Sequence, residues 1–486
     1  MRRSRGRAWP LALAALGTAC AQALGQTVSP METIDAANAL AHVRRLSDDA
    51  WRGRGTPSPG LDSAAGYVAR WYGRWGFEAR GDTGFIQRVP LLMLRRRVEA
   101  AWRVGETFRP MQVAVNIVLA EPPAGEGTWP VRVASNDSLP RDAAGSVVVF
   151  PPSTAAGEGM LARVAAARRA GAAAVLTVVP DEVVPRIAAA LAANEHESPW
   201  TVALPPRPLL VGWLAASAWR AVAPSARDGR LAWRLRVRVD TAARAWAPNV
   251  IAYLPGRDPQ LRHEVVVLSA HLDHVGVGPP VDDDSIYNGA DDNASGTAAL
   301  LEIAKAFAAL SPELRPRRSL LFLHVSGEEL GLLGSQWFVA HPPVPLAAIV
   351  ADLNIDIIGR NAPDTVVVVG KPFSTLGATI DSVAAAYPGL RLRPIDDPWP
   401  QEQLFLRSDH FSFAQHGIPA VFFFGGFHAD YHRPSDEADR IDADKLARVA
   451  RLVFAVARAV ADADARPRWN LRAWEQVRLL TGNNEP

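Results

Sequence analysis

The chain has 486 residues, more than one ordinary hydrophobic core uses, which predicts two globular units. Its 52 basic and 50 acidic residues nearly balance, and 49% of its residues are hydrophobic. This composition excludes a largely disordered chain and gives no sign of a nucleic-acid-binding surface. Small, neutral or peptide-like substrates are compatible with it.

The first 25 residues have the pattern of a signal peptide for export. A basic head, MRRSRGR, precedes an apolar stretch too short to span a bilayer, and small residues surround Ala21–Ala23. The one cysteine, Cys20, lies where a lipoprotein signal would place its acylated cysteine. Cleavage near Ala23 and a lipid anchor at Cys20 are therefore alternatives. We expect a periplasmic or secreted protein whose mature chain has no transmembrane span.

Residues 31–98 are predicted to be helical, because ETIDAANALAHVRRL and LDSAAGYVARWYGRWGF carry apolar residues at three- and four-residue spacing. Residues 100–245 differ, with short apolar runs such as GSVVVF and AAAVLTVV around one alanine-rich helix. This middle region gathers no cluster of histidines and carboxylates. We expect it to be an inserted β-rich domain without chemistry of its own.

From residue 246 onward, apolar strands alternate with helices. The strands HEVVVLSA, SLLFLHV and AAIVADLNID are separated by the helical stretches TAALLEIAKAFAAL and ELGLLGSQWFVA. This alternation predicts an α/β fold with three α/β/α layers around a mixed, mostly parallel sheet. The main domain is predicted to join residues 31–98 to 246–486, with 100–245 inserted between them.

Residues able to bind a metal follow several of these strands in succession. They are His271, Asp273, Asp291, Asp292, Glu328, Glu329, Asp356 and His432. Each has an ordinary explanation alone, since carboxylate pairs in loops are usually solvated and glutamates at a helix start complement the helix dipole. Their recurrence at strand ends, where parallel sheets bind ligands, is hard to obtain from unrelated loops.

The ligand types favour zinc. Histidines mixed with carboxylates, without a thiolate, suit Zn²⁺, whereas an all-oxygen set would suggest Mg²⁺ or Ca²⁺. The set exceeds the needs of one tetrahedral ion and fits two ions about 3.5–4 Å apart that share a bridging carboxylate and a water. The sequence therefore predicts a two-zinc centre that activates water and polarises a carbonyl.

Six separated motifs carry a family resemblance. They are SAHLDHVG, NGADDNASG, SGEELGLLGS, NIDIIG, SDHFSFAQHGIPA and DYHRPSD, within residues 246–445. In this order they resemble the dinuclear zinc aminopeptidases of the bacterial leucyl aminopeptidase type. Residues 46–71 and the middle region are similar to members with an inserted protease-associated domain. The resemblance implies a zinc exopeptidase fold and an aminopeptidase acting on peptides.

The resemblance also implies the zinc ligands. One zinc would be held by His271 and Asp356, and the other by Glu329 and His432. Asp292 would bridge them, because it heads the family's Asp-x-x-Ser-Gly motif.

Further residues would act around the two ions. Glu328 would be the general base, and Asp273 would orient His271 through the ring nitrogen that does not bind metal. Tyr431 would help to hold the developing oxyanion. Three other residues are expected to be structural, at the edge of the site or against the substrate: His274, His428 and Asp409.

Other activities on the same scaffold are alternatives. A carboxypeptidase or dipeptidase would need arginines to grip a substrate carboxylate, and only Arg360 and Arg407 lie near the motifs. A glutaminyl cyclase-like transferase, which resembles this family but uses one zinc, and a non-catalytic binding protein are less consistent with an intact set of five ligands.

Overall fold

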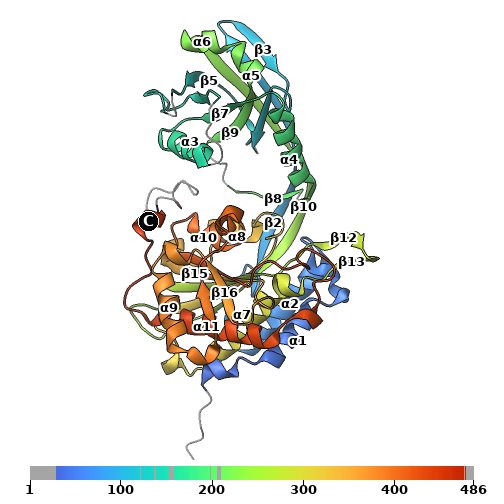
Figure 1. Ribbon diagram of the computed structural model, residues 1–486, viewed down its shortest axis with the longest axis vertical. Helices are drawn as coiled ribbons and strands as arrows, with labels where there is room; N and C mark the ends of the chain where they lie inside the picture. Colours follow the sequence, from blue (N-terminus) through green and yellow to red (C-terminus); the bar gives the residue numbers. More distant parts are fainter. Residues whose placement is uncertain are drawn as a thin grey trace, which may run out of the picture.

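Figure 1 shows the chain as a computed structural model. It describes residues 29–120, 122–135, 138–152, 158–197, 199–204, 209–474 and 477. The predicted signal peptide and Cys20 lie outside these residues. Within the described part of the chain, no helix is both long enough and apolar enough to span a bilayer.

The main part of the molecule is a mixed sheet in which strands run in the order β17-β16-β18-β15-β11-β14-β10. The four neighbouring strands β18, β15, β11 and β14 are parallel. β10 runs antiparallel to β14 and β16 antiparallel to β18, whereas β17 is parallel to β16. The strands are β10 (Leu231–Leu254), β11 (Val265–His271), β14 (Ser319–Val325), β15 (Ile349–Asp356), β16 (Thr365–Val369), β17 (Arg393–Ile395) and β18 (Ala420–Phe424).

Helices cover both faces of this sheet (Figure 1). Alternate residues of a strand face opposite sides, so Val266 and Leu268 of β11 pack in one hydrophobic cluster and Val265 and Val267 in another. The first cluster includes residues of α1 (Ala36–Leu46), α2 (Pro59–Arg74), α7 (Gly296–Ala308), α9 (Leu376–Ala386) and α11 (Ala443–Asp462). The second includes residues of α8 (Leu333–Ala340) and α10 (His410–Ala414). The predicted three-layer α/β fold is confirmed.

The prediction of helix throughout residues 31–98 is wrong beyond α2. Gly76 has a positive φ of 76° just after α2, a conformation that favours glycine and ends helices. The chain then forms β1 (Glu78–Ala79) and β2 (Ile86–Val104). β2 pairs with β10 along its whole length, from Ile86 opposite Val250 to Val104 opposite Leu231. This pairing with a distant strand stabilises an extended conformation that local spacing did not reveal.

The middle region extends away from the main sheet on the long strands β2 and β10 (Figure 1). It has a hydrophobic cluster of its own, in which Trp102 and Trp233 pack with residues such as Leu176. Its strands are β3 (Thr107–Met111), β4 (Ile117–Ala120), β5 (Gly125–Val133), β6 (Val147–Phe150), β7 (Ala174–Val179), β8 (Trp200–Val202) and β9 (Leu210–Ala215). Its helices are α3 (Glu158–Arg169), α4 (Val183–Glu197), α5 (Ala216–Arg220) and α6 (Ala223–Arg227). The division into domains stays a prediction, and β2 and β10 run through both of its internal boundaries.

Candidate metal centre

The predicted metal-binding residues lie at one edge of the sheet. His271 ends β11 and Asp356 ends β15, while His432 lies in the loop after β18. Glu328 and Glu329 follow β14 in a turn. They were expected to begin a helix, but α8 begins only at Leu333. Gly327 and Gly331, on either side of the two glutamates, have positive φ angles of 76° and 98°, which a helix does not allow.

Asp292 occupies the middle of the centre. One oxygen, Oδ1, lies 3.2 Å from Nε2 of His271, and the other, Oδ2, lies 3.1 Å from Nε2 of His432. A carboxylate placed in this way can bind one ion with each oxygen. The side chain of Asp292 is buried, so both oxygens are held within the site.

Two groups of donor atoms lie on the two sides of Asp292. On one side, Nε2 of His271 is 3.1 Å from Oδ1 of Asp356. On the other, Nε2 of His432 is 3.1 Å from Oε2 of Glu329. Within each group, the candidate donor atoms all lie within 4.8 Å of one another. The set of imidazoles and carboxylates is the one that zinc takes in proteins, so the residues present fit two zinc ions.

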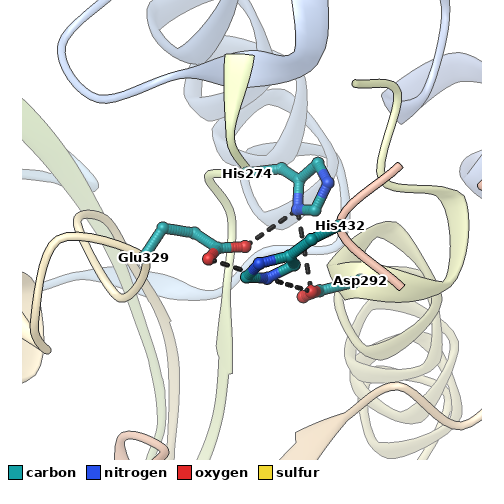
Figure 2. Close-up of side chains that lie close together, drawn as sticks. All are labelled: His274, Asp292, Glu329 and His432. Atoms are coloured by element: carbon teal, nitrogen blue, oxygen red, sulfur yellow. Dashed lines mark hydrogen bonds and ion pairs between the residues drawn. The ribbon is translucent and has the colours of Figure 1, made fainter. Parts of the chain in front are cut away.

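His274 lies closer to the second group than its predicted place at the edge of the site suggested (Figure 2). Its Nδ1 is 2.8 Å from Oε1 of Glu329 and 3.8 Å from Oδ2 of Asp292. The two oxygens of Glu329 thus face two different imidazoles, His432 through Oε2 and His274 through Oε1.

Asp273 was expected to orient His271 with its carboxylate. In the structure, the backbone carbonyl of Asp273 is the hydrogen-bond partner of His271 Nδ1, at 3.2 Å, and the carboxylate is 3.8 Å away. The carboxylate accepts hydrogen bonds from the Thr56 hydroxyl at 2.8 Å and from the backbone N–H of Glu328 at 3.3 Å. Asp273 therefore contacts both His271 and the turn that carries Glu328.

Two buried residues that were not singled out from the sequence hold the loops of the centre in place. Asp436 accepts hydrogen bonds from the backbone N–H groups of Asp291 and Asp292, at 3.0 and 3.1 Å. Arg54 donates hydrogen bonds to the carbonyls of Leu272 and Gly289, both at 2.9 Å, and it also contacts those of Leu46 and Asn288. Asp436 belongs to the motif DYHRPSD and Arg54 to RGRG, but neither motif shows which backbone groups they bind.

The electrostatics separate the roles of the carboxylates. Burial alone opposes ionisation of Asp292, but the imidazoles of His271 and His432 hold its pKa well below the usual value. Burial raises the pKa of Glu328 well above its usual value, with Asp409 and Glu329 adding to the rise and His271 opposing it. Asp292 is thus suited to remain ionised between cations, and Glu328 is suited to exchange a proton.

A small cavity, the inner pocket, opens beside these residues. It has a volume of about 70 Å³ and is lined by Asp292, Glu328, Asp356, Ile357, Leu404, Arg407, Ser408, Phe422, Phe424, Phe427 and Tyr431. The ring of Tyr431 stacks on His432 with 3.9 Å between centroids, and burial raises the pKa of its hydroxyl. The hydroxyl therefore keeps its proton and can donate a hydrogen bond.

The side chains of His428 and Asp409, also named in the sequence analysis, are buried near the centre but outside the two groups of donor atoms. Nε2 of His428 is 3.4 Å from Oδ2 of Asp291, so this histidine contacts the residue that precedes Asp292. Asp409 is fully buried at the start of α10.

Comparisons with known proteins show what part of this chain is similar to. Residues 249–457 match peptidase family M28. Leupeptin-inactivating enzyme 1 of Streptomyces exfoliatus is 34% identical over 201 residues, which cover 41% of this chain and 40% of that protein. The probable leucine aminopeptidase 2 of Aspergillus oryzae is 29% identical over 252 residues, 46% of each protein. A probable zinc metalloprotease of Leptosphaeria maculans is 32% identical over 157 residues, 31% of this chain and 34% of that protein. The chain thus spans less than half the length of these relatives.

Proposed function

We propose that this chain, whose residues 249–457 match peptidase family M28, is a zinc-dependent aminopeptidase that hydrolyses the N-terminal peptide bond of peptides. Two relatives are named a probable leucine aminopeptidase and a probable zinc metalloprotease. The observation that carries the proposal is the position of Asp292, whose two oxygens face His271 and His432 separately.

Five side chains would hold two zinc ions. His271 and Asp356 would bind one ion, Glu329 and His432 the other, and Asp292 both. Each ion would then have three protein ligands, which leaves a position for water or substrate. The chemistry that zinc supplies when bound is Lewis-acid activation of a water molecule and of the scissile carbonyl.

Glu328 is the proposed general base. It lies next to Glu329 in the same turn and lines the inner pocket together with Asp292 and Asp356. Its carboxylate would take a proton from the attacking water and pass it to the leaving amine. A buried carboxylate with a raised pKa is suited to both steps, because it accepts and releases a proton nearer to neutral pH.

Tyr431 and Asp273 are proposed to support this reaction. The protonated hydroxyl of Tyr431 would donate a hydrogen bond to the carbonyl oxygen of the substrate as negative charge develops there. The carbonyl of Asp273 fixes Nδ1 of His271 as a hydrogen-bond donor, so Nε2 is free to bind metal. The carboxylate of Asp273 holds the backbone of Glu328 and so positions the base.

The charges around the inner pocket favour the amino end of a peptide. The carboxylates of Asp292, Glu328 and Asp356 line it and complement an ammonium group. Arg407 is the only cation among the described residues that line it, and Arg360 is paired with Asp430 at 2.9 Å. Arg407 is the one feature that favours the alternative of a carboxypeptidase or dipeptidase, which would bind a free carboxylate.

A panel of peptides tests the proposal. Each peptide is offered free, N-acetylated or C-amidated, with a chelator and with zinc added back. Chelator-sensitive release of the N-terminal residue that N-acetylation abolishes is the expected result. Cleavage that tolerates N-acetylation but stops on C-amidation would establish a carboxypeptidase instead. Ammonia release from N-terminal glutamine without peptide cleavage would indicate a glutaminyl cyclase-like transferase, and binding without any turnover a non-catalytic protein.

Export and the nature of the inserted region belong to the same proposal. We propose that residues 1–25 direct export and that 100–245 form a protease-associated-like domain. Mass spectrometry of the mature N-terminus separates the two routes of export. A chain beginning near residue 24 indicates ordinary cleavage, and a chain beginning with acylated Cys20 indicates a lipid anchor.

A further inference from the structure

A second, larger cavity, the outer cleft, opens beside the metal centre. It has a volume of about 1130 Å³, against about 70 Å³ for the inner pocket. His274, Glu329 and His432 line it, whereas Asp292, Glu328 and Asp356 line the inner pocket. The two cavities share no lining residue, so they approach the metal centre from different sides. Only the outer cleft has the size that binds an extended ligand.

Three segments that are distant in the sequence form the walls of the outer cleft. They are residues 50–63, the start of the hairpin of β12 (Gly276–Val281) and β13 (Asp284–Tyr287), and Pro199–Trp200 of the middle region. Gly53 joins the first two walls, because a Cβ on it would lie 2.3 Å from the carbonyl oxygen of Tyr287. Its φ of 66° also requires glycine.

The third wall is attached to the main sheet. Trp200 lies opposite Met93 in the pairing of β8 with β2, and its side chain packs against the main hydrophobic cluster. The middle region thus contributes a fixed surface to a cavity that reaches the metal ligands Glu329 and His432.

The surface of the outer cleft is partly polar and partly apolar, and its apolar part includes two exposed valines. Val275 and Val277 are 39% and 47% exposed, which is unusual for valines on a hairpin beside a buried site. Prolines and Trp200 continue this surface. Arg52 is exposed and is the one arginine or lysine among the described residues that line the cleft.

We propose that the outer cleft binds the part of a peptide substrate that follows the cleaved bond, with Val275, Val277 and Trp200 as its apolar contacts. This inference rests on the proposed aminopeptidase function. An enzyme that releases one residue has to enclose only that residue, and the small, carboxylate-rich inner pocket accommodates it. The remaining peptide needs an open path from the metal centre, and the outer cleft begins at Glu329 and His432, which do not line the inner pocket.

Two substrates with the same N-terminal residue separate the cavities. The leaving group of leucinamide is ammonia, which is too small to contact the outer cleft. A hexapeptide that begins with leucine and continues with apolar residues would extend through the cleft. In Val277→Asp, we expect kcat/KM for the hexapeptide to fall about tenfold, and that for leucinamide to stay within about twofold. Trp200→Ala should show the same selectivity, which tests the contribution of the middle region.

Val115→Asp is the matched control. Val115 is 44% exposed, close to the 47% of Val277. It lies in the middle region and is not among the residues that line the outer cleft. We expect it to leave both substrates unaffected. Equal losses for leucinamide and the hexapeptide in Val277→Asp, or no loss for either in Val277→Asp and Trp200→Ala, would overturn the inference.

A binding measurement separates this inference from the proposed function. The probe is an N-acetylated form of the hexapeptide with fluorescein at its C-terminus, which an aminopeptidase does not cleave, and the readout is fluorescence anisotropy with the full chain. Val277→Asp should weaken binding about tenfold, and Val115→Asp should not. If leucinamide and the hexapeptide are both inert, the proposed function fails, while the anisotropy result still decides whether the cleft binds peptide. Equal affinity of wild type and Val277→Asp for the probe would refute the proposed role of the outer cleft and leave the proposed aminopeptidase function untouched.

Discussion

Asp409→Asn is expected to change how the stability of the metal-free chain depends on pH. The side chain of Asp409 is fully buried. Burial raises its pKa from 3.8 to about 7, with Asp273 and Asp356 adding to the rise and His271 opposing it. At pH 5 the carboxyl is therefore neutral in the folded chain and ionised in the unfolded chain. A raised pKa stabilises the folded state at low pH, and this contribution is lost as pH rises through about 7.

The magnitude follows from the size of the shift. From pH 5 to the folded pKa of about 7 is two units, each worth about 1.36 kcal/mol, so the contribution lost is about 3 kcal/mol. Asparagine does not titrate. The free energy of unfolding of Asp409→Asn, minus that of the wild type, should therefore rise by about 3 kcal/mol between pH 5 and pH 8.

Urea unfolding of both metal-free proteins at the two pH values measures this difference. Any fixed cost of placing an amide at this position cancels, because it is present at both pH values. Asp430→Asn is the control: burial alone would raise the pKa of Asp430, but hydrogen bonds from Ser435 and Arg360 hold it at about 2. Its contribution is complete by pH 5, so its difference should not change with pH. A change below about 1 kcal/mol for Asp409→Asn, or a change of opposite sign, would refute the reasoning.

Three further substitutions test the centre. Glu328→Gln should retain both zinc ions by elemental analysis and lose about 10²- to 10⁴-fold in kcat, because the amide cannot accept the proton of the water; full activity would remove Glu328 from the mechanism. Asp292→Ala should retain fewer than two zinc ions per chain, and two ions in this variant would contradict the bridging assignment. Arg54→Met should lower the free energy of unfolding by about 3–5 kcal/mol and weaken zinc binding, since it leaves the carbonyls of Leu272 and Gly289 unpaired. Unchanged zinc affinity in a competition assay with a chelator would show that Arg54 does not position the ligand loops.

The convergence of the candidate metal-binding residues could be predicted because strand ends are readable from sequence. In a parallel sheet, residues that end neighbouring strands are brought together by the register. Ser269 of β11 lies opposite Asn354 of β15, so His271 and Asp356, each two residues further along, end their strands side by side. Apolar runs that stop at a histidine or a carboxylate were therefore sufficient to predict where these side chains meet, while the type of metal stays a prediction.

The strand β2 could not be predicted in the same way. Buried residues alternate with more exposed ones near both of its ends, at Gln87, Val89 and Leu91 and again at Ala100 and Trp102, but the residues between are all exposed or half-buried. The extended conformation depends on pairing with β10, whose residues lie more than 100 positions away. The spacing of apolar residues along a segment shows which of its faces is buried, but it does not show which strand the segment pairs with. The helix predicted over residues 31–98 therefore extended too far.

The supporting residues were missed for a related reason. A motif shows which side chains have the chemistry to bind a metal, but it does not show which side chains bind the backbone that presents them. Asp436 has the same carboxylate as Asp292, yet its oxygens accept hydrogen bonds from backbone N–H groups and are not directed at the imidazoles of His271 and His432. Only the folded chain, in which the loop after β18 meets the loop before α7, separates these two functions.

The adjacent residues Asp291 and Asp292 also differ in this way: one binds the backbone, and the other faces the imidazoles. Oδ1 of Asp291 accepts a hydrogen bond from the backbone N–H of Gly359 at 2.6 Å, and its Oδ2 faces His428. Both oxygens of Asp292 face the imidazoles of the metal centre instead. Asp291 thus joins its own loop to the chain just beyond Asp356, the proposed ligand at the end of β15. One aspartate therefore ties the two loops together, and the other is left to face both imidazoles, as the proposed bridging role of Asp292 requires.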